Sequence, residues 1–178
     1  MEYVALFRGL NAGGKSTVKM AELTKAVSEL GYEKARSYLP SGNIIFETDE
    51  GSKTVTRTLE DLVLEHFKIE TKIVVKSCHQ LTRIVAEMPG EWENRKDLRR
   101  RVVFIREPVT PDDVLREVET REGIDFIEAG SGVLYMSTLM TALTRSWFTR
   151  LITKPIYKEL TIRDYGTVLR ILELMACR

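Results

Sequence analysis

The sequence has few residues of the kinds that build metal and redox sites. It contains two cysteines, Cys78 and Cys177, and two histidines, His66 and His79. No C-x-x-C pair occurs and the histidines lack zinc-ligand spacing, so we expect no metal site and no cofactor. Two free thiols in a reducing cytoplasm is the simpler interpretation of the cysteines, and a disulfide between them is the alternative.

The sequence also has almost no net charge and lacks long apolar runs. Its 27 basic and 26 acidic residues favour neither nucleic acid nor membrane as a general partner. No uninterrupted apolar segment approaches the roughly 18 residues of a membrane span. The opening residues, M-E-Y-V-A-L-F-R-G, do not resemble a signal peptide. We therefore expect a cytoplasmic protein. No Ser-His-Asp or Cys-His arrangement is evident, so no catalytic residue is assigned.

The apolar residues predict a folded α+β protein. With 178 residues, 43% of them hydrophobic, the chain can bury a core as one domain or two small ones. Apolar runs and helical periodicities follow in the order strand, helix, strand, strand, helix, strand, which is the order of a ferredoxin-like fold. These elements are expected at 3–7, 20–30, 36–39, 44–48, 55–67 and 73–75.

The later part of the chain repeats this order. Strands are expected at 102–105, 124–128, 133–136 and 160–162, with helices from Pro111, over 143–152 and at the C-terminal end. Segments 4–8, 41–48 and 83–88 match later segments at shifts of 98, 90 and 87 positions, as shorter loops in the second copy would produce. We predict two ferredoxin-like βαββαβ halves related by internal duplication, each an antiparallel sheet with helices on one face.

The expected boundaries follow from the repeat. The first half, with the helix after it, is placed at 1–90, and the second half, with a C-terminal helix, at 102–178. Residues 91–101 are polar, carry Trp92 and are expected to form a linker. The sequence leaves open whether the halves share one sheet or pack separately.

The stretch F-R-G-L-N-A-G-G-K-S at 7–16 holds the most specific motif. Gly9, Gly14, Lys15 and Ser16 match the phosphate-loop pattern G-x-x-x-x-G-K-[ST]. However, the helical periodicity begins near Met20, several residues late, and no apolar strand ends in an aspartate suited to magnesium. The motif therefore does not predict a nucleotide triphosphatase.

A weaker version of the motif remains. The amides of Gly13 and Gly14 can bind an anion, and Arg8 and Lys15 would add positive charge. The structural alternative is that the glycines permit a turn, Asn11 caps backbone groups and Lys15 is solvated.

The second half helps to choose between these interpretations. Its equivalent of the loop, E-P-V-T-P at 107–111, contains no glycine, which favours a function for the loop of the first half. Ser41-Gly42 recurs as Ser131-Gly132 and is expected to be turn chemistry. Asn43 is replaced by Val133, so its amide is expected to bond the Asn11 loop or a ligand.

These residues resemble a known family. R-G-L-N-A-G-G-K followed by M-A-E-L, and Y-L-P-S-G-N-I-I-F, are similar to two motifs of the bacterial domain of unknown function 1697 family. A third motif of that family, T-x-R-N-W-x-T, is matched at Thr161, Arg163 and Thr167, with Asp164-Tyr165 in place of Asn-Trp. The resemblance implies duplicated ferredoxin-like modules and no established activity.

The best prediction is a protein that binds a small anionic or phosphorylated ligand. The candidate residues are Arg8, Asn11, Gly13, Gly14, Lys15, Asn43 and Arg163. For Arg163, a salt bridge or capping contact is the structural alternative. Two other functions stay open. The basic cluster R-K-D-L-R-R-R at 95–101 could contact nucleic acid, although no RNA-recognition signature accompanies it. The chain could also be a structural or partner-interaction module.

Overall fold

A computed structural model describes residues 1–11, 18–175 and 177 of the chain. The chain divides into two compact units, the first made of Met1–Thr82 with Arg170–Arg178 and the second of Arg83–Leu169. It leaves the first unit within helix α3 (Cys78–Ala86) and returns to it within helix α5 (Tyr165–Leu174). Among the described residues, no helix is long and apolar enough to span a membrane.

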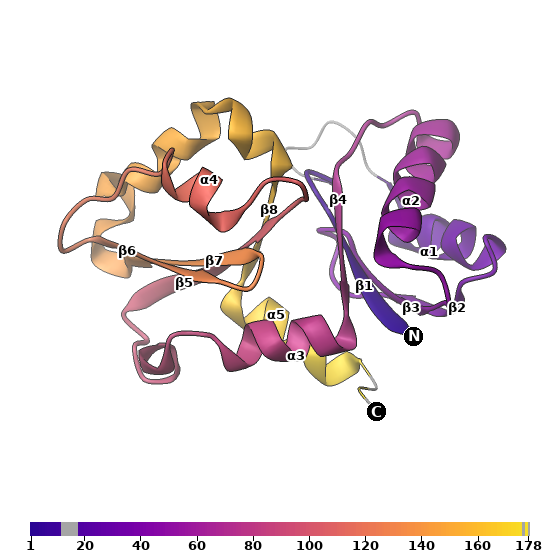
Figure 1. The fold of residues 1–178 in the computed structure, drawn as a ribbon, viewed down its shortest axis with the longest axis horizontal. Helices are drawn as coiled ribbons and strands as arrows, with labels where there is room; N and C mark the ends of the chain where they lie inside the picture. Colours follow the sequence, from indigo (N-terminus) through magenta and orange to yellow (C-terminus); the bar gives the residue numbers. More distant parts are fainter. Residues whose placement is uncertain (12–17, 176, 178) are drawn as a thin grey trace. The chain divides into compact units, whose positions relative to one another are not determined.

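The first unit is a four-stranded antiparallel sheet with the strand order β2-β3-β1-β4. Its elements are β1 (Glu2–Phe7), α1 (Met20–Glu29), β2 (Glu33–Ser37), β3 (Asn43–Glu47), α2 (Ser52–Phe67) and β4 (Ile73–Ser77). Helices α1 and α2 lie together on one face of the sheet (Figure 1). Alternate residues of each strand point to that face, so Ala5 and Phe7 pack in one core with Leu23, Leu59 and Val63.

The second unit has a four-stranded antiparallel sheet with the equivalent order, β6-β7-β5-β8. Its elements are η1 (Gly90–Glu93), β5 (Leu98–Ile105), α4 (Pro111–Leu115), β6 (Asp125–Gly130), β7 (Val133–Leu139), η2 (Met140–Arg145), η3 (Trp147–Thr153), η4 (Pro155–Glu159) and β8 (Leu160–Asp164). Val103, Ile105 and Met136 pack there against Val114 and Phe148.

The strand registers confirm the predicted duplication. Each first strand lies between the same two partners in its sheet, and the paired residues differ by the shifts found in the sequence. The matched sets are Val4 opposite Ile45 and Lys76, and Val102 opposite Tyr135 and Arg163. The fold is therefore two ferredoxin-like βαββαβ halves, as predicted from the repeat.

The α-helix predicted over 143–152 is wrong. Three 3-10 helices occupy residues 140–159, and Ser146 between the first two has an extended backbone. The Ser146 hydroxyl donates to the buried carboxylate of Asp125 at 2.6 Å, and the Trp147 N–H donates to the same carboxylate at 2.8 Å. These bonds fix the chain at Ser146 and interrupt helical propagation there.

The linker expected over 91–101 also needs correction. Strand β5 begins at Leu98, so Arg99, Arg100 and Arg101 lie in a strand that pairs with β7. Arginine has no strand preference that would reveal this in the sequence. Trp92 is buried in the short helix η1.

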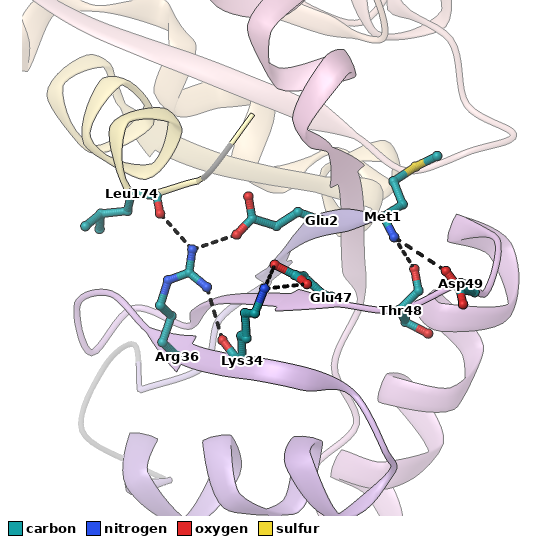
Figure 2. A network of polar contacts seen from close by, with 8 residues as sticks. All are labelled: Met1, Glu2, Lys34, Arg36, Glu47, Thr48, Asp49 and Leu174. Carbon is teal, nitrogen blue, oxygen red and sulfur yellow. Dashed lines mark hydrogen bonds and ion pairs between the residues drawn. The ribbon is translucent and has the colours of Figure 1, made fainter. Parts of the chain in front are cut away.

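The prediction of two free thiols is wrong, because Cys78 and Cys177 form a disulfide. The C-terminal residues return to the first unit, which brings the two cysteines together although 99 positions separate them. Hydrogen bonds of Arg36 also connect the C-terminal residues to the first sheet. Arg36 of β2 donates to the carbonyl of Leu174 and to the carboxylate of Glu2, both at 2.7 Å (Figure 2).

Candidate functional site

The glycine-rich loop follows strand β1 and ends at Val18, just before helix α1. Three of the predicted ligand-binding residues, Gly13, Gly14 and Lys15, lie outside the residues that the structure describes. The described parts are the two ends of the loop and the hairpin beside them. The contacts of these parts show how the two ends of the loop are fixed to the rest of the first unit.

Asn11 joins both ends of the loop through one side chain. Its carbonyl oxygen accepts from the Val18 N–H at 2.7 Å, and its amide donates to the Val18 carbonyl at 2.9 Å. The same amide donates to the Pro40 carbonyl at 2.9 Å. Asn11 has a left-handed backbone, with φ of 58°, which asparagine tolerates better than most residues. The expected capping role of Asn11 is therefore observed.

The hairpin between β2 and β3 packs directly on this base. Gly42 has φ of 81°, and a Cβ atom at this position would lie 2.9 Å from the Cβ of Phe7 and 3.1 Å from Leu10. The Phe7 N–H donates to the Gly42 carbonyl at 2.9 Å. Only glycine satisfies both the backbone angle and the close approach.

Asn43 is fully buried and holds the same hairpin closed. Its amide donates to the Tyr38 carbonyl at 2.7 Å and to the Ser41 hydroxyl at 3.3 Å. It lies opposite Leu6 on β1. These two bonds lie within the hairpin itself, and the hydrogen bond between hairpin and loop is made by Asn11, whose amide donates to the Pro40 carbonyl.

Arg8 starts the loop from a fixed backbone position. Its N–H donates to the Lys72 carbonyl at 2.9 Å, and its carbonyl accepts from the Thr71 hydroxyl at 2.8 Å. The equivalent Arg106 N–H donates to the Glu159 carbonyl at 2.9 Å in the second unit. The backbone position of Arg8 is therefore a property of the duplicated fold.

Arg163 belongs to the second unit and lies in strand β8. It is 8% exposed, donates to the Ile162 carbonyl at 2.9 Å, and burial lowers its pKa to about 10, so it is still charged at neutral pH. Lys76 occupies the matching place in the first sheet and is also buried. A buried cation at this strand position thus recurs in both halves, which favours the structural interpretation of Arg163.

Three arginines of the basic cluster contact groups of their own chain. Arg95 makes hydrogen bonds of 2.8 and 2.9 Å with the Asp97 carboxylate. Arg99 lies 3.9 Å from Asp164, and the Arg100 guanidinium lies 4.6 Å from the centre of the Tyr165 ring. Asp164 and Tyr165 are the residues at which the third motif departs from its usual Asn-Trp, so these departures are matched by contacts with the cluster.

Asp125 is a buried polar residue that sequence reasoning missed. Its carboxylate accepts from the N–H of Arg121 and of Trp147, and from the hydroxyls of Thr138 and Ser146, at 2.6 to 3.1 Å. Nothing in its sequence surroundings marks it, since its partners lie up to 22 positions away. The network joins β6, β7 and η3 and has no histidine, because both histidines lie in the first unit.

An acidic hollow of about 480 Å³ lies at the other end of the first sheet, where Glu33, Glu47, Asp49 and Glu50 line it. Three of its carboxylates are already engaged. Glu47 pairs with Lys34 at 2.8 Å, which lowers the Glu47 pKa, while Asp49 lies 3.8 Å from the N-terminal amine and Glu50 accepts from Tyr32. Among the described residues, no group of three His, Cys, Asp or Glu side chains could hold a metal ion.

The matched sheets and the hairpin-anchored loop define a duplicated α+β protein of the ferredoxin-like class. A family model described as "Protein of unknown function (DUF1697)" matches residues 1–135, and the chain belongs to this family. The matched range includes the loop, Asn43 and the basic cluster, and ends before Arg163.

Comparison with solved structures gives a strong likeness over nearly the whole chain. The structure of the conserved bacterial protein SP0830 from Streptococcus pneumoniae matches with a TM-score of 0.86 and 26% sequence identity, and the match covers 97% of each chain. Comparison with curated proteins found no match.

Proposed function

We propose that the first unit binds a small anionic or phosphorylated ligand at the glycine-rich loop. Asn11 is the observation that supports this proposal most strongly, because its amide fixes both ends of the loop to one point on the hairpin. A loop held at its base loses less conformational freedom when it closes on a ligand. Gly13 and Gly14 would supply N–H donors, and Arg8 and Lys15 positive charge.

The equivalent connection in the second unit shows what the fold requires by itself. After β5, the chain reaches helix α4 through Thr110, whose hydroxyl caps the helix by accepting from the Asp113 N–H at 3.2 Å. That connection needs neither a glycine-rich segment nor an asparagine bridge. The first unit therefore carries a loop that the topology does not demand. The basic cluster has no comparable support as a nucleic-acid site, because Arg95, Arg99 and Arg100 contact their own chain.

A thermal-shift screen of nucleotides and phosphorylated metabolites tests the proposal. The variants are Lys15→Ala and, as a matched control, Lys19→Ala, which removes an exposed lysine paired with Glu22 just beyond the loop. At 100 times its dissociation constant, a ligand should stabilise the wild type by about 2.7 kcal/mol. We expect the control to keep this gain and Lys15→Ala to lose most of it. The proposal fails if no anion stabilises the wild type, or if Lys15→Ala responds equally.

A further inference from the structure

A small pocket opens on the helix-bearing face of the second sheet. It has a volume of about 60 Å³, and Val103, Met136, Phe148 and Leu151 supply apolar walls. Ile152, which is 57% exposed, lies at its edge. Among the charged side chains of the described residues, only Arg101 lines this pocket.

Arg101 occupies a position where the fold normally places a core residue. It alternates with Val103 and Ile105 along β5 and lies opposite Met136 of β7. The equivalent residue of the first unit is Tyr3, which is 5% exposed and packs its ring 6.2 Å from that of Phe46. The second unit thus has a cation and a hollow where the first unit has a packed aromatic ring.

The Arg101 guanidinium has no hydrogen bond or ion pair with any residue that the structure describes. Asp164 lies opposite Arg101 on β8, but its carboxylate is paired with Arg99 at 3.9 Å. Burial lowers the Arg101 pKa and the nearby Arg99 charge lowers it further, while the charges of Asp164, Tyr157 and Asp125 act in the opposite direction. A guanidinium carries five donors in a planar fork. Arg101 is partly exposed, so water can satisfy these donors until an anion in the pocket takes its place.

The dimensions and chemistry of the pocket define what it can hold. An anion is needed to pair with the guanidinium, and a carboxylate matches its fork with two parallel hydrogen bonds. A volume of about 60 Å³ accommodates roughly four to six non-hydrogen atoms. The walls contributed by Val103, Phe148 and Leu151 favour an apolar remainder of the ligand, although Thr149 and Tyr157 also line the pocket.

We propose that this pocket binds a short-chain aliphatic carboxylate. The carboxylate pairs with the Arg101 guanidinium, and the hydrocarbon chain packs against Val103, Met136, Phe148 and Leu151. Binding pairs the Arg101 guanidinium with an anion and fills the hollow. This ligand site is separate from the glycine-rich loop, which lies in the other unit.

Butyrate is the probe, and the methyl resonance of Met136 in the full-length protein is the observable. Butyramide, a neutral molecule of the same shape, and inorganic phosphate are run beside it. The variants are Arg101→Met, Arg101→Lys and the control Arg95→Met, which removes an arginine of the basic cluster that is paired with Asp97 and lies outside the pocket. We expect a butyrate dissociation constant on the order of millimolar for the wild type and for Arg95→Met.

The wild type should bind butyramide at least about tenfold more weakly than butyrate, because butyramide has no charge. Arg101→Met and Arg101→Lys should bind butyrate at least about tenfold more weakly than the wild type does, because the first loses the charge and the second loses the planar fork. Phosphate should not compete, since it lacks the chain. Equal binding of butyrate and butyramide to the wild type would overturn the proposal without any variant. It is likewise overturned if phosphate competes on equal terms, if Arg101→Met binds butyrate as tightly as the wild type, or if Met136 does not respond to butyrate.

Discussion

At the scale of single residues, Gly42 shows how closely the hairpin is fitted to the base of the glycine-rich loop. Gly31 has a similar left-handed backbone, with φ of 88° against 81°, but a Cβ atom there would meet nothing within 4 Å. Substitutions at these two glycines therefore distinguish the cost of backbone strain from the cost of a steric clash. The sequence predicted Gly42 as a turn residue, and only the structure reveals its contact with Phe7 and Leu10.

We predict that Gly42→Ala lowers the free energy of unfolding by about 2–4 kcal/mol, from left-handed strain and overpacking together. Gly31→Ala should lose only about 1–2 kcal/mol, from the strain. Urea unfolding of both variants measures the difference. Equal losses would show that the contact with Phe7 and Leu10 does not constrain the hairpin.

Tyr32 makes the stability of the first unit depend on pH in the alkaline range. Burial, together with a hydrogen bond to Glu50, raises its pKa from 10.0 to about 12. The unfolded chain therefore releases this proton first. The stability that Tyr32 contributes is fully present below pH 10 and is lost as pH rises toward 12.

Urea unfolding across this pH range should show a shallower decline in Tyr32→Phe than in the wild type. Some decline remains in the variant, because burial also raises the pKa of Tyr135 in the second unit. A decline of the same slope in wild type and variant would mean that Tyr32 ionises alike in the folded and unfolded chain.

At the scale of secondary-structure elements, Asp125 explains the short 3-10 helices that the second unit has between β7 and β8. Four donors from three segments converge on its carboxylate, and two of them, Ser146 and Trp147, belong to the turn where helix formation is interrupted. An amide in the same place would present its NH₂ group to some of these donors.

Asp125→Asn should therefore cost about 3 kcal/mol of unfolding free energy. Asp112→Asn, an exposed change in the first turn of α4, should stay within about 0.5 kcal/mol. Chemical unfolding followed by tryptophan fluorescence reports both, since Trp147 adjoins the network. A loss no larger than that of the control would contradict the role assigned to Asp125.

The strands and their order could be predicted because their apolar runs and turn residues are local signals. The shifts of 98, 90 and 87 positions also identified which positions of the first half correspond to which positions of the second, and the strand registers agree with them. Other features depend on long-range contacts and leave no local pattern. The start of β5 at Leu98, the break at Ser146 and the contacts of the basic cluster belong to this group.

The candidate site divides in the same way. Asn11 and the Ser41-Gly42 turn were predicted because asparagine and glycine have distinctive backbone preferences. The pairing of Asn11 with both Val18 and Pro40 could not be, since Pro40 lies 29 positions away. The Arg101 pocket was hidden for the same reason. An arginine beside two others in the sequence gives no sign that it replaces a core residue.

At the scale of the whole chain, the Cys78–Cys177 disulfide ties the C-terminal residues to the end of β4 and the start of α3. It closes a loop of about 100 residues, and cross-links of that length restrict the unfolded chain strongly. Persistent disulfides are rare in a reducing cytoplasm. A cytoplasmic location stays a prediction.

We predict that Cys177→Ser lowers the free energy of unfolding by about 2–4 kcal/mol. Addition of dithiothreitol should destabilise the wild type to the same level and leave the variant unchanged. Thermal unfolding with and without reductant makes this comparison. Two titratable thiols in the unreduced native protein would contradict the bond itself.

Anion binding at the glycine-rich loop is tested most directly by nuclear magnetic resonance of the ¹⁵N-labelled full-length protein, titrated with inorganic pyrophosphate. The account predicts saturable downfield shifts of the Gly9, Gly13 and Gly14 amide protons in the wild type. The apparent dissociation constant for pyrophosphate obtained from these shifts should be at least about tenfold higher in Lys15→Ala than in the wild type, and unchanged in Lys19→Ala. Absence of saturable shifts at these glycines, or equal shifts in both lysine variants, would contradict it.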